Sequence, residues 1–283
     1  MAAPEVPIWA LVHLTHAALQ RTADRASVDL LHIKGPATRS TLRAGRHDST
    51  DTDVLVRPAH LEKFLAALAA DGWTLFTEFE EGSPFGHAAN FTHPSWTYAD
   101  VHRHLPGPRL GADAVFDLLW RDREPAEIGH LMCPAPSLVG QVLVQTLHSA
   151  RSHGLEPSEA WELSSADVRD QARALARELQ AETALAAAIG ELDAHRGAPD
   201  HALWEYWSSS DNDRLDEWAA RYRSAESTAE RWRVLRQAMH VNRTHLRLRL
   251  GHEPGPIEVF REQCARIWHG AASGLRRARK GRS

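Results

Sequence analysis

The segment from Leu30 to Val56 places the strongest constraint on the fold of this chain. It reads as a short apolar strand, a tight turn at Lys34-Gly35-Pro36, a short helical stretch over residues 37–43, and a second strand that begins with Asp51-Thr52-Asp53. Side chains along a strand alternate between its two faces, so Asp51 and Asp53 share one face. Two carboxylates at this spacing repel each other, and an apolar surface accepts them only together with a cation. The sequence therefore predicts a cation-binding position at the start of the second strand.

A later apolar stretch supplies a third carboxylate. Residues 88–92 and 96–104 read as two extended runs separated by a Pro-Ser turn, which predicts a β-hairpin. In the second run Asp100, His102 and His104 occupy every second position and share one face. Asp100 is therefore the candidate to join the first two acids, with His102 and His104 beside it as hydrogen-bond partners or substrate contacts.

Two other interpretations of these residues stay open at this point. The acids near Asp51 can be a solvated pair on an edge strand, which is common. The Asp-x-His-x-His run that starts at Asp100 can also hold zinc, since a catalytic zinc ion takes three protein ligands and a water. A zinc hydrolase is thus a distinct hypothesis, although no helical His-x-x-x-His pair or close pair of cysteines accompanies the run.

Strands and helices mix in the first half of the chain, and helices dominate the second. Hydrophobic spacing predicts helices over residues 7–21, from Pro58 onward and over 114–120, strands over 29–33, 52–57 and 73–79, and a polar loop over 80–87. From Ser137 onward, helices are predicted to begin near residue 138 and to cover 168–181, 182–195, 213–223, 229–249 and 257–277. The tryptophans expected to pack between these helices are Trp204, Trp207, Trp218, Trp232 and Trp268. The predicted fold class is α+β, with a mixed sheet flanked by helices in residues 1–133 and an all-helical domain in residues 134–283.

Composition limits the partners and the compartment. The 283 residues carry a formal net charge of −4, which gives no electrostatic footprint for general nucleic-acid binding. The one basic block, residues 276–282, is expected to be a solvated terminus. Cys133 and Cys264 lie far apart and indicate no disulfide framework. No charged segment followed by an apolar core opens the sequence, and no stretch approaches the length of a membrane span, so we expect a cytoplasmic protein without membrane contact.

Taken in order, the motifs resemble a known family. They are Lys34-Gly35 after a strand, Arg46 before the acids, Asp51-Thr52-Asp53-Val54-Leu55-Val56, and Ala99-Asp100-Val101-His102. This set resembles the uncharacterised nucleotidyltransferase family of the DNA polymerase beta-like nucleotidyltransferase superfamily, over residues 10–150. The resemblance implies a nucleotidyltransferase-type mixed sheet with flanking helices. One departure is that most active members of the wider superfamily carry Gly-Ser or Gly-Gly where this chain has Lys34-Gly35.

Nucleotidyl transfer suggests a role for each of these residues. The attacking and leaving oxygens are both anionic at the transition state, and divalent cations held by carboxylates stabilise them. Mg²⁺ (or Mn²⁺) suits oxygen ligands. Asp51 and Asp53 would hold the nucleotide-associated ion, while Asp53 and Asp100 would hold the second, with Asp100 also a general base. The groups expected to contact the β- and γ-phosphates are Lys34, the Gly35 amide and Arg46, although a salt bridge to a nearby aspartate is an equal alternative for Arg46.

The predicted activity is transfer of NMP from an NTP such as ATP to a hydroxyl or amine of an acceptor. The acceptor is expected to be a small molecule, a peptide or a protein, because the helical second half would close a cleft over the sheet. A catalytically inactive protein of the same fold, which grips a partner without turnover, is the alternative from the binding class. The three mutually repelling acids argue against it.

Overall fold

The structure, a computed structural model, describes residues 6–44, 49–82, 85–151, 158–209, 214–225, 227–239, 241–265 and 268. The chain forms two compact units, residues 1–195 and residues 196–283. No helix in the described part of the chain is both long enough and apolar enough to cross a membrane.

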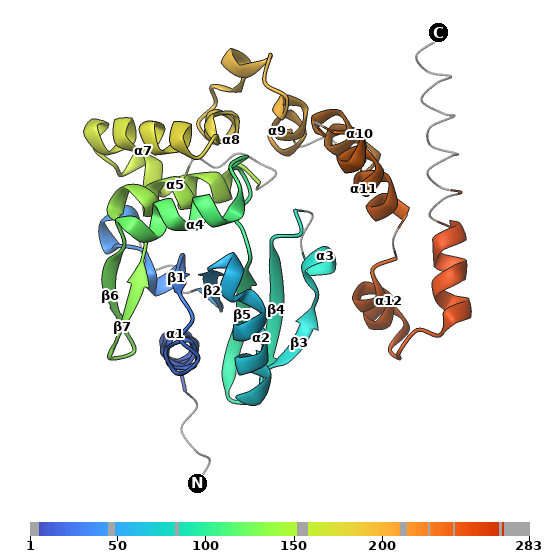
Figure 1. Ribbon diagram of the computed structural model, residues 1–283, viewed down its shortest axis with the longest axis horizontal. Coiled ribbons are helices and arrows are strands. Elements are labelled where there is room, and N and C mark those ends of the chain that lie inside the picture. The colour runs from blue at the N-terminus through green and yellow to red at the C-terminus, as the bar shows by residue number, and fades with distance from the viewer. Residues whose placement is uncertain are drawn as a thin grey trace. The chain divides into compact units, whose positions relative to one another are not determined.

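A five-stranded mixed sheet forms the centre of the first unit (Figure 1). Its strands are β1 (Leu30–His32), β2 (Asp51–Val56), β3 (Thr74–Thr77), β4 (Ala88–His93) and β5 (Trp96–His102), in the spatial order β1-β2-β5-β4-β3. β2 and β5 are parallel, and every other neighbouring pair is antiparallel. The predicted hairpin of β4 and β5 is confirmed. Parallel pairing of β2 with β5 needs a long connection, and the intervening chain provides it.

One face of this sheet is apolar and is covered by two helices, α1 (Ile8–Arg25) and α2 (Leu61–Ala70). The predicted helix over residues 7–21 is confirmed, and it continues one turn further. The residues that pack in this layer include Leu19, Val54, Val56, Phe64, Leu68, Ala99 and Val101. Each large side chain buried in such a layer stabilises the fold by about 1.5–3 kcal/mol. Because side chains alternate along a strand, Asp53 and Asp100 project from the opposite face.

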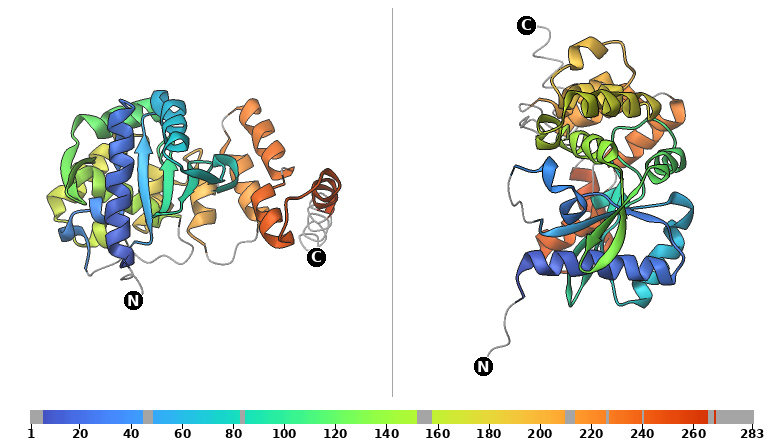
Figure 2. Two further views of the ribbon diagram at one scale, coloured as in Figure 1. Left: turned by 90° about the horizontal axis from the view of Figure 1, so that it is seen from below. Right: turned by 90° about the vertical axis from the view of Figure 1, so that its left-hand side faces the viewer.

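The rest of the first unit is mainly helical. Its elements are the short helix α3 (Phe79–Gly82), then α4 (Ala112–Arg121), the hairpin β6 (Glu124–Ile128) and β7 (Leu131–Ala135), α5 (Leu138–Ser149), α6 (Glu159–Glu162), α7 (Ala166–Glu178) and α8 (Glu182–Ala188). α5, α7 and α8 lie together on the side of the sheet away from α1 (Figures 1 and 2). Ser137 caps α5 by accepting a hydrogen bond from the Gly140 amide.

α5 is fastened to the strand that precedes the Lys34-Gly35 turn. Gln145 Nε2 donates to the Ile33 carbonyl at 3.1 Å and to Thr38 Oγ1 at 3.0 Å. These bonds tie the first predicted helix of the second half to the end of β1. The two compact units meet after residue 195, and the expected domain boundary between residues 133 and 134 stays a prediction.

The described part of the second unit consists of helices. They are α9 (His201–Trp207), α10 (Arg214–Ser224), α11 (Thr228–Met239), α12 (Arg243–Leu250) and a helical segment over residues 256–265. Trp204 and Trp207 are buried as predicted. Trp232 and Trp268 are 71% and 74% exposed, so the prediction that they pack between helices is wrong.

Several local predictions differ from the structure. Residues 37–43 do not form the expected helix: two single 3₁₀ turns, Gly35–Ala37 and Ser40–Leu42, are separated by extended backbone at Thr38. No α-helix N-terminus therefore faces the Lys34-Gly35 turn. The polar loop expected over residues 80–87 starts as α3, and the helix expected over 229–249 is two helices, α11 and α12.

The β6–β7 hairpin was not predicted at all. Each of its strands contains a proline, Pro125 or Pro134, and proline within a run argues against a strand. The turn signal was present, since Gly129 and His130 both adopt positive φ angles of 58° and 62°, as a tight hairpin turn requires.

Candidate functional site

Three polar side chains from three neighbouring strands stand in a row on the second face of the sheet. Asp53 of β2 lies directly opposite Asp100 of β5, which in turn lies opposite Asn90 of β4. Opposed residues of neighbouring strands project from the same face, so the two carboxylates and the amide lie side by side. Asn90 Nδ2 donates to Asp100 Oδ1. The sequence had indicated the two acids, but not their register or the amide.

Asp53 is almost fully buried, and two donors hold the same one of its oxygens. Lys34 Nζ lies 2.6 Å from Asp53 Oδ1, and His102 Nε2 lies 2.8 Å from it. Burial alone would raise the pKa of Asp53, but the charge of Lys34 and the hydrogen bond from His102 outweigh it and hold the pKa well below its usual range. Asp53 is therefore ionised, and Oδ2 is the oxygen left to face a cation.

Asp100 has the opposite electrostatic environment. Burial, together with the neighbouring charge of Asp53, raises the pKa of Asp100 to about 6. The hydrogen bond from Asn90 acts in the other direction but does not cancel the effect. Two carboxylates placed in register on adjacent strands have little solvent to separate their charges, so a positive ion between them would relieve the repulsion.

His102 is oriented by Asp53. Burial lowers the pKa of His102, although Asp53 opposes the shift. An ionised carboxylate only accepts hydrogen bonds, so the neutral imidazole donates from Nε2–H and leaves Nδ1 unprotonated. Nδ1 is buried and finds no hydrogen-bond partner within the described part of the chain. His102 was expected to be a partner of Asp100 or a substrate contact, and in the structure its hydrogen-bond partner is Asp53.

The remaining predicted residues lie around this row. Asp51 is opposite Tyr98 in the register, and Ser49 Oγ lies 2.8 Å from Asp51 Oδ1. Burial and the nearby Arg103 lower the pKa of His104 to about 4. Arg46, predicted to contact phosphate, lies outside the described residues.

Gly35 occupies a position that favours glycine. Its φ angle is +58°, in the left-handed region that other residues enter at a cost. A Cβ at this position would lie 3.6 Å from His16 Nε2 and 3.5 Å from Ser49 Cβ, so the turn is closely packed. The turn predicted at Lys34-Gly35 is confirmed.

A buried histidine pair supports this turn and was missed in the sequence. His16 of α1 and His32 of β1 are both fully buried, with their Nδ1 atoms 2.7 Å apart. His32 Nε2 lies 3.0 Å from Gln20 Oε1. Burial lowers the pKa of His16 to about 3, so the pair is neutral at neutral pH. Val12 and Leu19 are four residues before and three residues after His16, so the helical spacing of α1 already placed His16 on the inward face.

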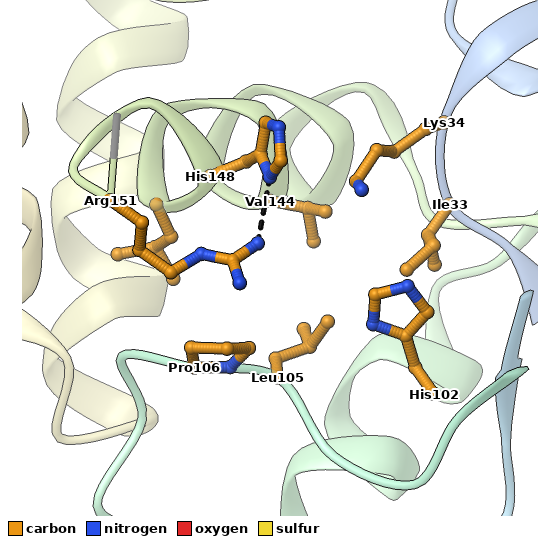
Figure 3. Close-up of a pocket in the computed structure, with 9 residues that line it drawn as sticks. Ile33, Lys34, His102, Leu105, Pro106, Val144, His148 and Arg151 are labelled. Carbon is orange, nitrogen blue, oxygen red and sulfur yellow. Dashed lines mark hydrogen bonds between the residues drawn. The ribbon is translucent and has the colours of Figure 1, made fainter. Parts of the chain in front are cut away.

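Arg151 and His148, near the end of α5, also belong to the surroundings of the site. They line a cavity together with Lys34 and His102 (Figure 3). Nothing in their sequence spacing distinguishes them from the many other arginines and histidines of the helical half. Only the packing of α5 beside β1 brings them next to Lys34.

The donor set fits a divalent cation. Asp53, Asp100 and His102 each offer a ligand atom, and these atoms all lie within 4.8 Å of one another. Two carboxylates suit Mg²⁺ or Mn²⁺, whereas an added imidazole would favour zinc. Since His102 Nε2 is engaged with Asp53, the carboxylates of Asp53 and Asp100 are the natural ligands. Asp51 and His104 are not members of this cluster of described residues.

Two solved structures are loosely similar to this chain. One is the lincosamide antibiotic adenylyltransferase LnuA in its lincomycin-bound crystal structure, with a TM-score of 0.36, 14% identity, and coverage of 60% of this chain and 96% of the other. Another is the antibiotic-resistance factor ANT(2'')-Ia in solution, with a TM-score of 0.38, 13% identity, and coverage of 68% and 95%. No family model and no curated protein matches the chain. Likeness at this level does not establish a shared activity, so family membership stays a prediction and function has to be inferred from the site.

Proposed function

We propose that this chain is a metal-dependent nucleotidyltransferase that moves NMP from an NTP to a hydroxyl or amine of a small molecule, a peptide or a protein. The observation that carries the proposal is the in-register pair of carboxylates, the buried Asp53 and the half-buried Asp100, with Lys34 paired to the first. Neighbouring acids that repel each other away from full solvent are costly unless the fold uses them, and cation binding is the use that fits their geometry.

The residues divide the work as follows. A divalent cation held by Asp53 and Asp100 would supply stabilisation of the charge that develops at the transferred phosphoryl group. Lys34 keeps Asp53 ionised, and His102 fixes the orientation of its carboxylate. Asp100 is proposed to accept the proton of the acceptor hydroxyl as the hydroxyl oxygen bonds to the α-phosphorus. The bond from the α-phosphorus to the bridging oxygen then breaks, and pyrophosphate leaves. Asp51 stays a predicted additional ligand at the margin of the row.

A direct test uses NTPs labelled at the α-phosphate. The full-length protein is incubated with each labelled NTP, with Mg²⁺ or Mn²⁺, and with a mixture of hydroxyl- and amine-bearing small molecules, and labelled products are resolved and identified by mass spectrometry. We expect a labelled adduct and one pyrophosphate for each NMP transferred. Asp100→Asn should reduce the rate by orders of magnitude, since it removes both a ligand and a base.

The matched control is Asp170→Asn, because Asp170 is exposed on α7 and lies outside the site. Its rate should equal that of the unmodified protein. Adduct formation that survives Asp100→Asn unchanged would contradict the proposed site.

Two other functions remain as outcomes of the same experiment. Lys34 already neutralises Asp53 within the protein, which also suits a protein that binds a partner without turnover. That interpretation predicts no adduct with any acceptor, and partner binding indifferent to Asp100→Asn. The nitrogen of His102 in the cluster also admits zinc. Hydrolysis that depends on Zn²⁺ and on His102, without nucleotide transfer, would favour a zinc hydrolase.

A further inference from the structure

Among the described residues, an arginine beside the site contacts neutral groups. Arg151 follows α5, and its Nη1 lies 2.9 Å from His87 Nε2 while its Nη2 lies 2.7 Å from His148 Nδ1. A guanidinium only donates hydrogen bonds, so both imidazole nitrogens accept and carry no proton. The guanidinium also lies 5.7 Å from the centre of the Phe85 ring. All three partners orient Arg151, but none of them neutralises its charge.

In the described part of the chain, no carboxylate forms an ion pair with Arg151. Burial lowers the pKa of Arg151 to about 10, with Asp53 the acid that opposes the shift. The group is thus still cationic at neutral pH. A half-buried cation held only by neutral groups is costly, and it marks a place where an anion would be stabilised.

A narrow cavity connects Arg151 with Lys34. Figure 3 shows the two cationic side chains entering it from opposite sides, with His148 on one wall and Leu105 and Pro106 on another. The space open to the centre of a water molecule is about 10 Å³, enough for about one water. The cavity is partly open to solvent, so an anion larger than one water would meet Arg151 and Lys34 at its open side. Lys34 also forms an ion pair with Asp53, so the cavity borders the row of carboxylates on the sheet.

We propose that Arg151, oriented by His87 and His148, binds the β- and γ-phosphates of the donor nucleotide across the cavity from Lys34. The proposal rests on the proposed function, since it assigns the donor's terminal phosphates a place in the same site. It also makes the diphosphate group the recognised chemistry, so free pyrophosphate binds the same position. Asp53 partly balances the positive charge of Lys34, whereas Arg151 offers its full positive charge to the phosphates. A guanidinium can meet two phosphate oxygens at once, which an ammonium cannot.

The test measures binding, not turnover. Isothermal titration calorimetry on the full-length protein, with EDTA present to remove metal, compares inorganic pyrophosphate, ATP and AMP. Pyrophosphate and ATP carry the diphosphate group and AMP lacks it. We expect Arg151→Gln to weaken pyrophosphate and ATP binding by about tenfold to a hundredfold, the usual loss for a charged hydrogen-bonding group. AMP binding should not change.

Two further variants separate the anion site from a general loss of structure. Arg151→Lys keeps the charge but loses the planar fork, so its pyrophosphate affinity should fall between those of the wild type and Arg151→Gln. Arg177→Gln, an exposed arginine on α7, is the matched control and should bind pyrophosphate normally. Unfolding temperatures measured on all variants identify any that fail to fold.

Each outcome bears on the proposal. Unchanged pyrophosphate affinity in a folded Arg151→Gln protein overturns it, and so does an equal loss for AMP, which would place Arg151 at the part common to all three ligands. Arg151-dependent pyrophosphate binding without nucleotide transfer to any acceptor would keep the anion site and reject the transferase. Nucleotide transfer that depends on Asp100 but not on Arg151 would keep the transferase and reject the anion site at Arg151.

Discussion

Replacing Asp100 with asparagine should stabilise the protein in the absence of metal. The pKa of Asp100 rises from 3.8 to about 6 in the folded protein, because burial and the Asp53 charge disfavour its ionised form. A shift of this size corresponds to at most about 3 kcal/mol of folding free energy, since part of the side chain is solvated. Asparagine keeps the shape and an oxygen that accepts from Asn90, but it carries no charge.

The sign of the pH dependence follows from the direction of the shift. The folded state holds the Asp100 proton more tightly than the unfolded state, so this contribution to stability is complete below about pH 4 and is lost as pH rises through about 6. The Asp100→Asn protein does not lose stability in this way as the pH rises, because asparagine does not titrate. The difference in unfolding free energy, variant minus wild type, should therefore increase by up to about 3 kcal/mol between pH 4 and pH 8.

Urea unfolding in EDTA at several pH values measures this difference. The other titrating groups are common to both proteins and cancel, and Asp170→Asn again serves as the control. In thermal unfolding the gain at pH 8 corresponds to about 6 °C. A difference that stays flat or falls with rising pH would refute the argument that Asp53 and Asp100 repel each other.

Metal should offset most of the variant's stability advantage at pH 8. At a hundredfold excess over its dissociation constant, a cation that binds only the folded state adds about 2.7 kcal/mol. Mg²⁺ or Mn²⁺ should therefore raise the stability of the wild type at pH 8, while the Asp100→Asn protein, which lacks a ligand, gains little. Equal metal stabilisation of both proteins would place the cation elsewhere.

The remaining predictions concern Lys34 and the boundary of the first compact unit. Lys34→Ala leaves Asp53 buried without its cation, so it should destabilise the protein by about 3 kcal/mol in urea unfolding at pH 7. Adding Asp53→Asn to this variant should recover most of the lost stability. A double variant no more stable than Lys34→Ala alone would contradict a stabilising pair. A chain that ends after Ala135 lacks α5 and its bonds to the end of β1, so it should be poorly soluble, whereas a chain that ends after His195 keeps the whole first compact unit and should unfold cooperatively. A soluble, cooperatively unfolding fragment that ends at Ala135 would show that α5 is dispensable.

The sequence alone determined the local pattern of the site. Alternation along the strands placed Asp53 on the face opposite Val54, and it placed Asp100 on one face of the later run together with His102. Local periodicity depends only on backbone geometry, so it can be read from the residues themselves. The Lys34-Gly35 turn was visible for the same reason, because a positive φ angle favours glycine.

The tertiary structure decided which residues from distant segments contact one another. Asp53 and Asp100 oppose each other only because β2 and β5 pair in parallel with one particular register, and Asn90 completes the row from β4. His102 turned out to hold Asp53 and not the neighbour expected from its own strand, since strand pairing sets cross-strand distances that sequence spacing does not contain. The packing of α5 on β1 likewise brought Arg151 to the cavity beside Lys34. Trp232 was expected to be buried but is exposed. An apolar residue on a helix is buried only where another element packs against its face, and the periodicity within the helix does not show whether one does.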